Sequence, residues 1–152
     1  MAFDTLSTQE TIRAYLATEA GVVVYDTEFP QVKDEPMDNG VPVAYIVMRS
    51  NDTIAPATGG SFGGARFGDH YTLLDFLVVA ATPDEARELA FGPDGVNDIL
   101  IGYRPDANSG EMTKRGGGQV FTSGDGTAAR PSRYISRCSF RLSVNLQITE
   151  SA

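Results

Sequence analysis

Residues 134–148 read YISRCSFRLSVNLQI, and apolar and polar side chains alternate along most of this stretch. From Cys138 onward the even positions are apolar and the odd positions are polar. Successive side chains of a strand point to opposite faces, so the pattern predicts a strand with one buried and one solvated face. A strand of this length would span roughly 50 Å at about 3.3 Å per residue, more than most strands. We therefore expect it to bend, to bulge or to run past its sheet.

The whole chain has the composition of one globular domain. Its 152 residues, 41% hydrophobic and 21% charged, fit a single domain spanning 1–152. No apolar run reaches the roughly 18 residues that cross a bilayer, and no signal pattern opens the chain. We therefore expect that the protein does not associate with a membrane and that it is synthesised in the cytosol. The lone Cys138 falls on the apolar face of the strand, where a small core residue is expected.

Charge is unevenly distributed along the chain. Residues 1–103 contain 5 basic and 16 acidic side chains, whereas residues 104–152 contain 7 basic and 4 acidic ones, and the formal net charge is −8. An acidic chain is a poor candidate for gripping nucleic acid through its phosphates. The pattern is compatible with an ordinary solvated surface, or with contact between the basic part of one copy and the acidic part of another.

Two helix starts have capping signals. Residues 7–10 (STQE) form a capping box, and Gly21 is a natural stop for the helix that follows. Residues 82–85 (TPDE) combine a capping threonine, a first-turn proline and a glutamate three residues after the cap. Gly92-Pro93 interrupts this second helix, and residues 96–100 predict a short helix beyond the break.

Three shorter apolar runs predict further strands, at residues 22–25, 43–49 and 71–81. Two long glycine-rich segments, 51–70 and 104–133, predict loops, with one short strand over 119–122 in the second. The predicted fold class is α+β: a mostly antiparallel sheet with helices packed on one face and two long Gly-rich loops.

No pattern in the sequence predicts catalysis, a cofactor or a metal. The glycines of 59–68 are not followed by the Lys-Ser/Thr pair of a phosphate loop. They also do not form the Gly-x-Gly-x-x-Gly pattern, between a strand and a helix, of a dinucleotide-binding site. The single His70 has no nucleophile elbow to accompany it, and one histidine with one cysteine cannot build a zinc site. The acidic, proline-containing segment 26–42 matches no EF-hand spacing and is interpreted as a solvated loop.

Arg137 and Arg141 share the polar face of the long strand, about 13 Å apart at the usual rise. One interpretation is a solubilising face that discourages pairing with other sheets. The other is a polar contact with a neighbouring subunit.

The order of these elements resembles that of the tail terminator, or tail completion, proteins of long-tailed bacteriophages. The resemblance covers nearly the whole chain and includes the acidic loop and the apolar strand around Tyr45. Its other parts are the helix closed by Gly21, VVVYD at 22–26, TPDEA at 82–86, GGG at 116–118, and RPSRY at 130–134 leading into the final strand.

Members of that family have an α+β fold and form hexameric rings that cap the tail tube, stop its polymerisation and join it to the head connector. The resemblance implies a structural virion protein, made in the bacterial cytoplasm, without cofactor or catalysis. Its implied partners are itself, the major tail tube protein and the head-tail connector protein, with DNA only as cargo in the channel. The residues expected at subunit or tube interfaces are Phe62, Arg66, Phe67, Lys114, Arg115, Arg137 and Arg141.

Three alternatives remain open. The protein could be a head-tail connector stopper or another minor tail component, for which the same physical features would be expected. A free-standing ligand-binding module would be a stable monomer. A small enzyme would use His70 with a nearby acid.

Overall fold

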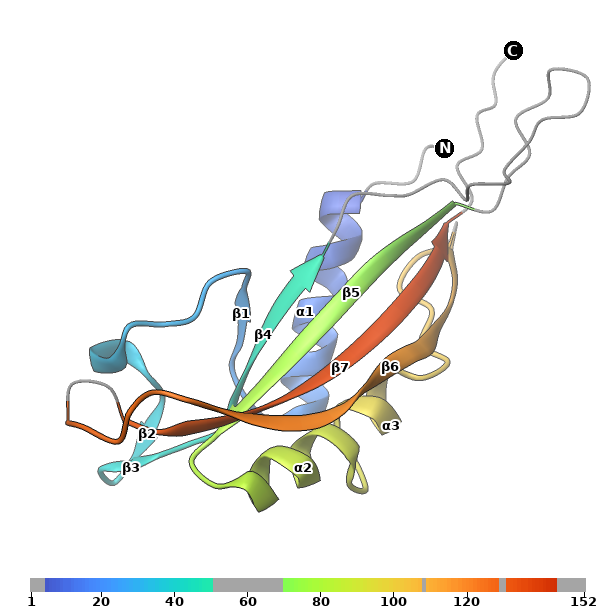
Figure 1. Ribbon diagram of the computed structural model, residues 1–152. Helices are drawn as coiled ribbons and strands as arrows, with labels where there is room; N and C mark the ends of the chain where they lie inside the picture. Colours follow the sequence, from blue (N-terminus) through green and yellow to red (C-terminus); the bar gives the residue numbers. More distant parts are fainter. Residues whose placement is uncertain (1–4, 51–69, 108, 129–130, 145–152) are drawn as a thin grey trace, which may run out of the picture.

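The computed structural model describes residues 5–50, 70–107, 109–128 and 131–144 (Figure 1). The helices are α1 (Thr5–Ala20), the single 3-10 turn η1 (Val32–Asp34), α2 (Pro83–Phe91) and α3 (Val96–Leu100). The strands are β1 (Val24–Asp26), β2 (Met37–Asp38), β3 (Val41–Pro42), β4 (Tyr45–Ser50), β5 (His70–Ala80), β6 (Ser109–Ser123) and β7 (Arg133–Val144).

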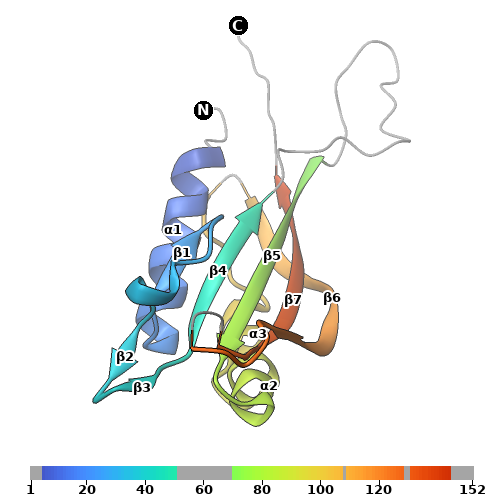
Figure 2. The same ribbon diagram turned by 60° about the vertical axis from the view of Figure 1, so that its left-hand side comes forward.

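One five-stranded sheet, in the order β1-β4-β5-β7-β6, forms the body of the molecule, and β2 with β3 makes a separate hairpin. Figure 2 shows the five strands following one another in this order. Only β1 runs parallel to its neighbour β4, whereas the other pairs are antiparallel. The sequence-based prediction of an α+β fold with a mostly antiparallel sheet is confirmed.

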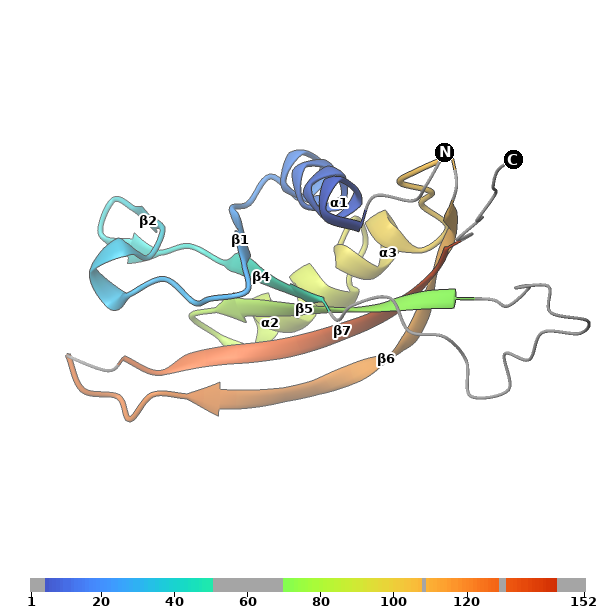
Figure 3. The same cartoon turned by 90° about the horizontal axis from the view of Figure 1, so that it is seen from above.

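The helices pack on one face of this sheet, as Figure 3 shows for α1 and α3. In α1, Ile12 and Leu16 lie one turn apart and are fully buried. They share one apolar cluster with Ala90 of α2 and Leu100 of α3. The same cluster contains the inward-facing side chains of the central strands, which are Ile46, Met48, Leu74, Phe76, Val78, Cys138, Phe140 and Leu142. This face therefore holds the main core.

The alternating stretch forms the expected strand next to the centre of the sheet. β7 pairs with β5 without interruption from Tyr134 opposite Ala80 to Val144 opposite His70. Cys138 and Phe140 are fully buried, which confirms the predicted apolar face. The predicted solvated face is only partly exposed, because Ile135 and Ser139 on it are also buried. Residues 145–148 of the prediction lie outside the described residues.

The two predicted helix starts have different outcomes. The start predicted at Ser7 is wrong, because α1 already includes Thr5 and Ser7 therefore lies inside the helix. The second start is confirmed: the Thr82 hydroxyl accepts a hydrogen bond from the Glu85 amide at 3.2 Å. The predicted break is confirmed too, since α2 ends before Gly92.

The short strand predicted at 119–122 is confirmed, but the loop predicted around it is wrong for residues 109–118 and Ser123, because the whole of 109–123 forms the long edge strand β6. Its register against β7 shifts at three places, and each shift inserts one extra residue into β6. Gly117 and Gly118 have φ angles of 123° and 116°, and a Cβ at Gly117 would collide with the Arg137 carbonyl oxygen. The glycines therefore make bulges in an ordered strand, because only a residue without a side chain fits there.

The other predicted glycine-rich loop, over 51–70, lies outside the described residues except for His70, which begins β5.

Candidate functional site

The sheet face opposite the helices is the candidate site, and we call it the open face. Strand register places on it every second residue of the central strands. These are Tyr45, Val47 and Arg49 of β4, Tyr71, Leu73, Asp75, Leu77 and Val79 of β5, and Ile135, Arg137, Ser139, Arg141 and Ser143 of β7. A small apolar cluster, separate from the main core, forms part of it from Tyr25, Tyr45, Val47, Leu77, Val79 and Ile135.

A polar cluster of three residues lies near the middle of the open face. The Ser139 hydroxyl donates to Asp75 Oδ1 at 2.5 Å, and Arg137 Nε donates to Ser139 Oγ at 3.1 Å. The Arg137 guanidinium also reaches both Asp75 oxygens, at 3.3 and 3.4 Å. The side chain of Arg137 is still 53% exposed, so the ion pair is a surface pair of small energetic weight. Its guanidinium remains available to a further acceptor, since Arg carries five N–H donors.

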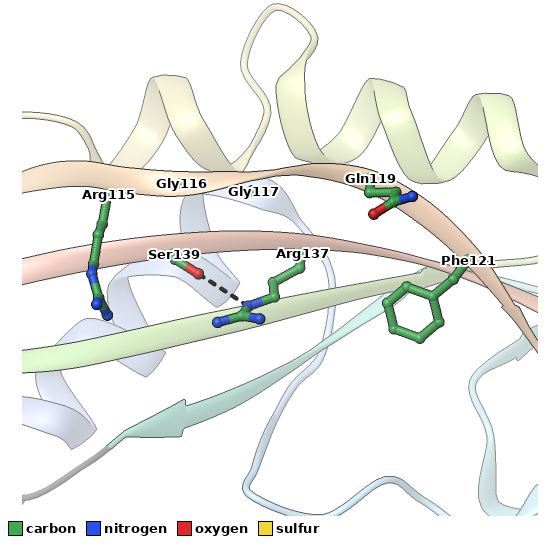
Figure 4. Close-up of a pocket in the computed structure, with 7 residues that line it drawn as sticks. All are labelled: Arg115, Gly116, Gly117, Gln119, Phe121, Arg137 and Ser139. Carbon is green, nitrogen blue, oxygen red and sulfur yellow. Dashed lines mark hydrogen bonds between the residues drawn. The ribbon is translucent and has the colours of Figure 1, made fainter.

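Two shallow hollows of about 420 and 490 Å³ flank Arg137. The first lies between β6 and β7, and Figure 4 shows Arg115, Gln119 and Phe121 of β6 beside Arg137 and Ser139. The bulge between Lys114 and Gly116 places the extra residue Arg115 here. The second hollow is more apolar, and it is lined by Phe29, Arg49, Asp75, Leu77, Phe121, Ser123, Ile135 and Arg137.

Two further arginines of the open face lie against aromatic rings. The guanidinium carbon of Arg141 is 4.2 Å from the centroid of Tyr71, and that of Arg49 is 5.1 Å from Phe29. Arg49 Nε also donates to the Thr27 carbonyl at 3.1 Å. Aromatic contacts of this kind orient an arginine while leaving donors free.

A buried ion pair closes one end of the open face. Arg133 Nε donates to Glu35 Oε2 at 2.8 Å, and the two side chains are only 12% and 6% exposed. It joins the segment after η1 to the start of β7, which are 98 residues apart. Tyr45 lies beside this pair, and burial, followed by the nearby Glu35 carboxylate, raises its pKa to about 12. The phenol is therefore neutral at physiological pH.

The structure brings together only part of the predicted interface set. Arg115 and Arg137 line one hollow, and Arg141 lies on the same face. Lys114 pairs in register with the core residue Phe140 and lies over the Phe91 ring of α2, so it belongs to the opposite side of the sheet. The predicted residues Phe62, Arg66 and Phe67 lie outside the described residues.

Sequence reasoning missed Arg49, Asp75 and Phe121 as parts of this face. One signal was present for Asp75, which is the only charged residue of the apolar run 71–81. Its partners Arg137 and Ser139 are more than 60 residues away, so only strand pairing identifies them.

The described residues contain no group of three or more His, Cys, Asp and Glu side chains placed to hold a metal ion. Burial raises the pKa of Cys138 to about 12, and its thiol donates a weak hydrogen bond to the Ala90 carbonyl at 3.7 Å. It is thus an unreactive core thiol, as its pattern predicted. His70 lies at the start of β5, and its side chain is outside the described part. No helix in the described ranges is long and apolar enough to cross a membrane.

No protein-family model matches the sequence, and no curated protein matches it with significant similarity.

Proposed function

We propose that this protein is a self-assembling structural subunit of a bacteriophage tail. In this proposal, copies of the chain form a ring of six that caps the tail tube, stops its polymerisation and joins it to the head connector. DNA passes through the ring as cargo. The protein acts in the virion after assembly in the bacterial cytoplasm and has no catalytic role, cofactor or metal.

The observation that carries the proposal is the uncovered open face. A domain of one sheet and one helical layer can fold with only one face of the sheet covered, and here the helices cover that face. The opposite face nevertheless combines the arginines Arg49, Arg115, Arg137 and Arg141 with apolar side chains and two hollows. Arginine and aromatic residues are enriched at protein interfaces, so this composition favours protein contact.

The edge of the sheet supports contact through the face and not through strand addition. β6 is the outermost strand, but its three bulges and its charged Lys114 and Arg115 interrupt the regular ladder that another strand would need. At the other edge β1 has only three residues. Both edges are therefore poor templates for a neighbouring strand.

Two other observations support an assembly role. The sequence resembles tail terminators over nearly its whole length, and the predicted α+β fold is present. Large side chains of the projecting β2–β3 hairpin are also unusually exposed, since Met37 and Val41 are 54% and 61% accessible (Figures 1 and 2). Exposed apolar side chains in a projecting hairpin suit contact with a partner.

The test is the native mass of the purified protein, alone and mixed with a tail-tube preparation, together with negative-stain images. We expect six-fold rings, free or at one end of the tubes, and tubes that stop growing once capped. A monomer that leaves tube growth unchanged in both samples would overturn the proposal. Rings that bind a head connector but not the tube would instead indicate a connector stopper.

A ligand-binding module is the second candidate, because the larger hollow combines apolar walls with Arg49 and Arg137. Such a site suits a small apolar anion. A stable monomer whose melting temperature rises with aromatic carboxylates would favour this function over the ring.

A further inference from the structure

The open face has a counterpart of opposite charge on the other side of the molecule. Five exposed carboxylates lie in and between α2 and α3, and we call them the acidic patch: Asp84, Glu85, Glu88, Asp94 and Asp98. Arg87 is the only basic residue among positions 83–100, and it pairs with Asp84 at 3.2 Å. From β6, Lys114 lies over the Phe91 ring at the end of α2. Ile101, directly after α3, adds a half-exposed apolar side chain next to this patch.

The hollows of the open face have the reverse charge. Among the described residues that line them are three arginines, Arg49, Arg115 and Arg137, and one acid, Asp75. Arg115 forms no ion pair with any described residue. A chain with a net charge of −8 thus gathers free guanidinium donors on one surface. These donors match carboxylates in geometry as well as in charge.

The two surfaces lie on opposite sides of the sheet. α2 and α3 contribute Ala90, Val96 and Leu100 to the main core, which lies on the far side of the sheet from the open face. The acidic patch is the outward side of that helical layer. One molecule therefore cannot bring its own acidic patch to its own open face, but two molecules can stack face to back.

We propose that the open face of one copy binds the acidic patch of the next copy. The carboxylates of the patch would pair with Arg115 and Arg137, and apolar side chains beside them would enter the hollow lined by Leu77, Phe121 and Ile135. Two different surfaces meet in such a contact, so it is head-to-tail and repeats from copy to copy, closing into a ring when the rotation allows. This inference rests on the proposed ring function and names its subunit contact.

Charge reversal of each surface tests the contact. The first variant is Arg115→Glu with Arg137→Glu, and the second is Asp84→Lys with Glu88→Lys. All four side chains are exposed, so both variants should fold, which circular dichroism and thermal melting would verify. Each variant alone should lose self-association by about 100-fold or more, because like charges then face each other across the contact.

Mixing the two variants gives the decisive result. In a ring in which the two variants alternate, every contact joins either two charge-reversed surfaces or two native ones. An equal mixture should therefore recover the mass of the wild-type assembly. All four substitutions in one chain should recover it as well. The control matched to the first variant is Lys33→Glu with Arg104→Glu, which lowers the net charge by the same amount at exposed positions outside the hollows and should leave the mass unchanged.

The outcomes separate this contact from the proposed function. If both variants still form the same rings as the wild type, the proposed contact alone is overturned. The contact is also overturned if the two variants fold but stay monomeric when they are mixed. If the wild type forms open chains or dimers and the variants do not, the result would support the contact and overturn the ring. A wild-type monomer, alone and with tubes, would overturn both.

Discussion

The two faces of the sheet are made from the same strands but have different chemistry. Phe140 and Leu142 of β7 point into the main core and are almost completely buried. Their neighbours Ser139 and Arg141 point to the open face, where they contact Asp75 and Tyr71. Adjacent residues thus have different surroundings: the helix-covered face holds the main core, and the open face carries exposed hydrogen-bond donors such as Arg137 and Arg141. Substitutions one residue apart should therefore affect different measurements.

The largest expected effect comes from truncating matched phenylalanines on the two faces. Phe140→Ala should lower the free energy of unfolding by about 3–5 kcal/mol, because it leaves a cavity against Phe76. Phe121→Ala should cost less than about 1 kcal/mol, because Phe121 is 48% exposed. Urea unfolding of both variants measures the difference. Equal losses would contradict the division between the faces.

The buried ion pair is the exception on the open face, since it should matter for stability. Glu35→Gln should cost about 3 kcal/mol, because it leaves the Arg133 guanidinium buried without its partner. The neighbouring Asp34→Asn is the control, and it should cost less than about 0.5 kcal/mol because Asp34 is exposed. Urea unfolding at neutral pH gives both values. A Glu35→Gln loss no larger than the control's would show that solvent reaches the pair.

Tyr45, next to that pair, gives a smaller effect that depends on pH. Its pKa is about 12 in the folded protein and about 10 in the unfolded chain, so the folded state binds the phenolic proton more tightly. The contribution of the protonated Tyr45 phenol to the free energy of unfolding is complete below pH 10 and is lost as the pH rises through 12. Unfolding free energies measured from pH 9 to 12 should fall less steeply for Tyr45→Phe than for the wild type. Identical slopes would mean that Tyr45 ionises as it does in water.

The smallest effect on stability, and the largest on assembly, is expected from Arg137→Glu with Arg141→Glu. The monomer should stay folded, with a loss of about 1 kcal/mol or less, because both side chains are exposed. Rings and tail caps should disappear from native mass measurements and micrographs. The double lysine variant keeps both charges and should still assemble, although more weakly. Normal assembly of the glutamate variant would remove these two residues from the interface.

Local sequence patterns predicted those elements whose signal lies within the element itself. The alternation of 134–148 predicted β7, and Thr82 to Glu85 predicted the start of α2, because strand period and helix capping are local properties. Ser7 was misleading as a boundary signal, since α1 begins before it.

Most of β6, all but the short strand predicted at 119–122, was missed because its bulges interrupt the alternation on which strand prediction depends. Each inserted residue shifts the pattern by one, and three consecutive glycines are more typical of loops. Pairing with β7 orders this segment, and that pairing is not visible in the sequence of β6. The cluster of Asp75, Arg137 and Ser139 was missed for the same reason, since its members meet only across paired strands.

The sequence by itself determined the fold class, the long strand and the inward side chains of β7. It did not determine which face of the sheet the helices would cover, because β4 and β5 are apolar on both sides. Tertiary packing decided this: α1, α2 and α3 cover the side of Phe76 and Phe140. The other side was left with fewer apolar residues and with arginines from three strands. Residues distant in sequence form that surface, so only the folded chain reveals it.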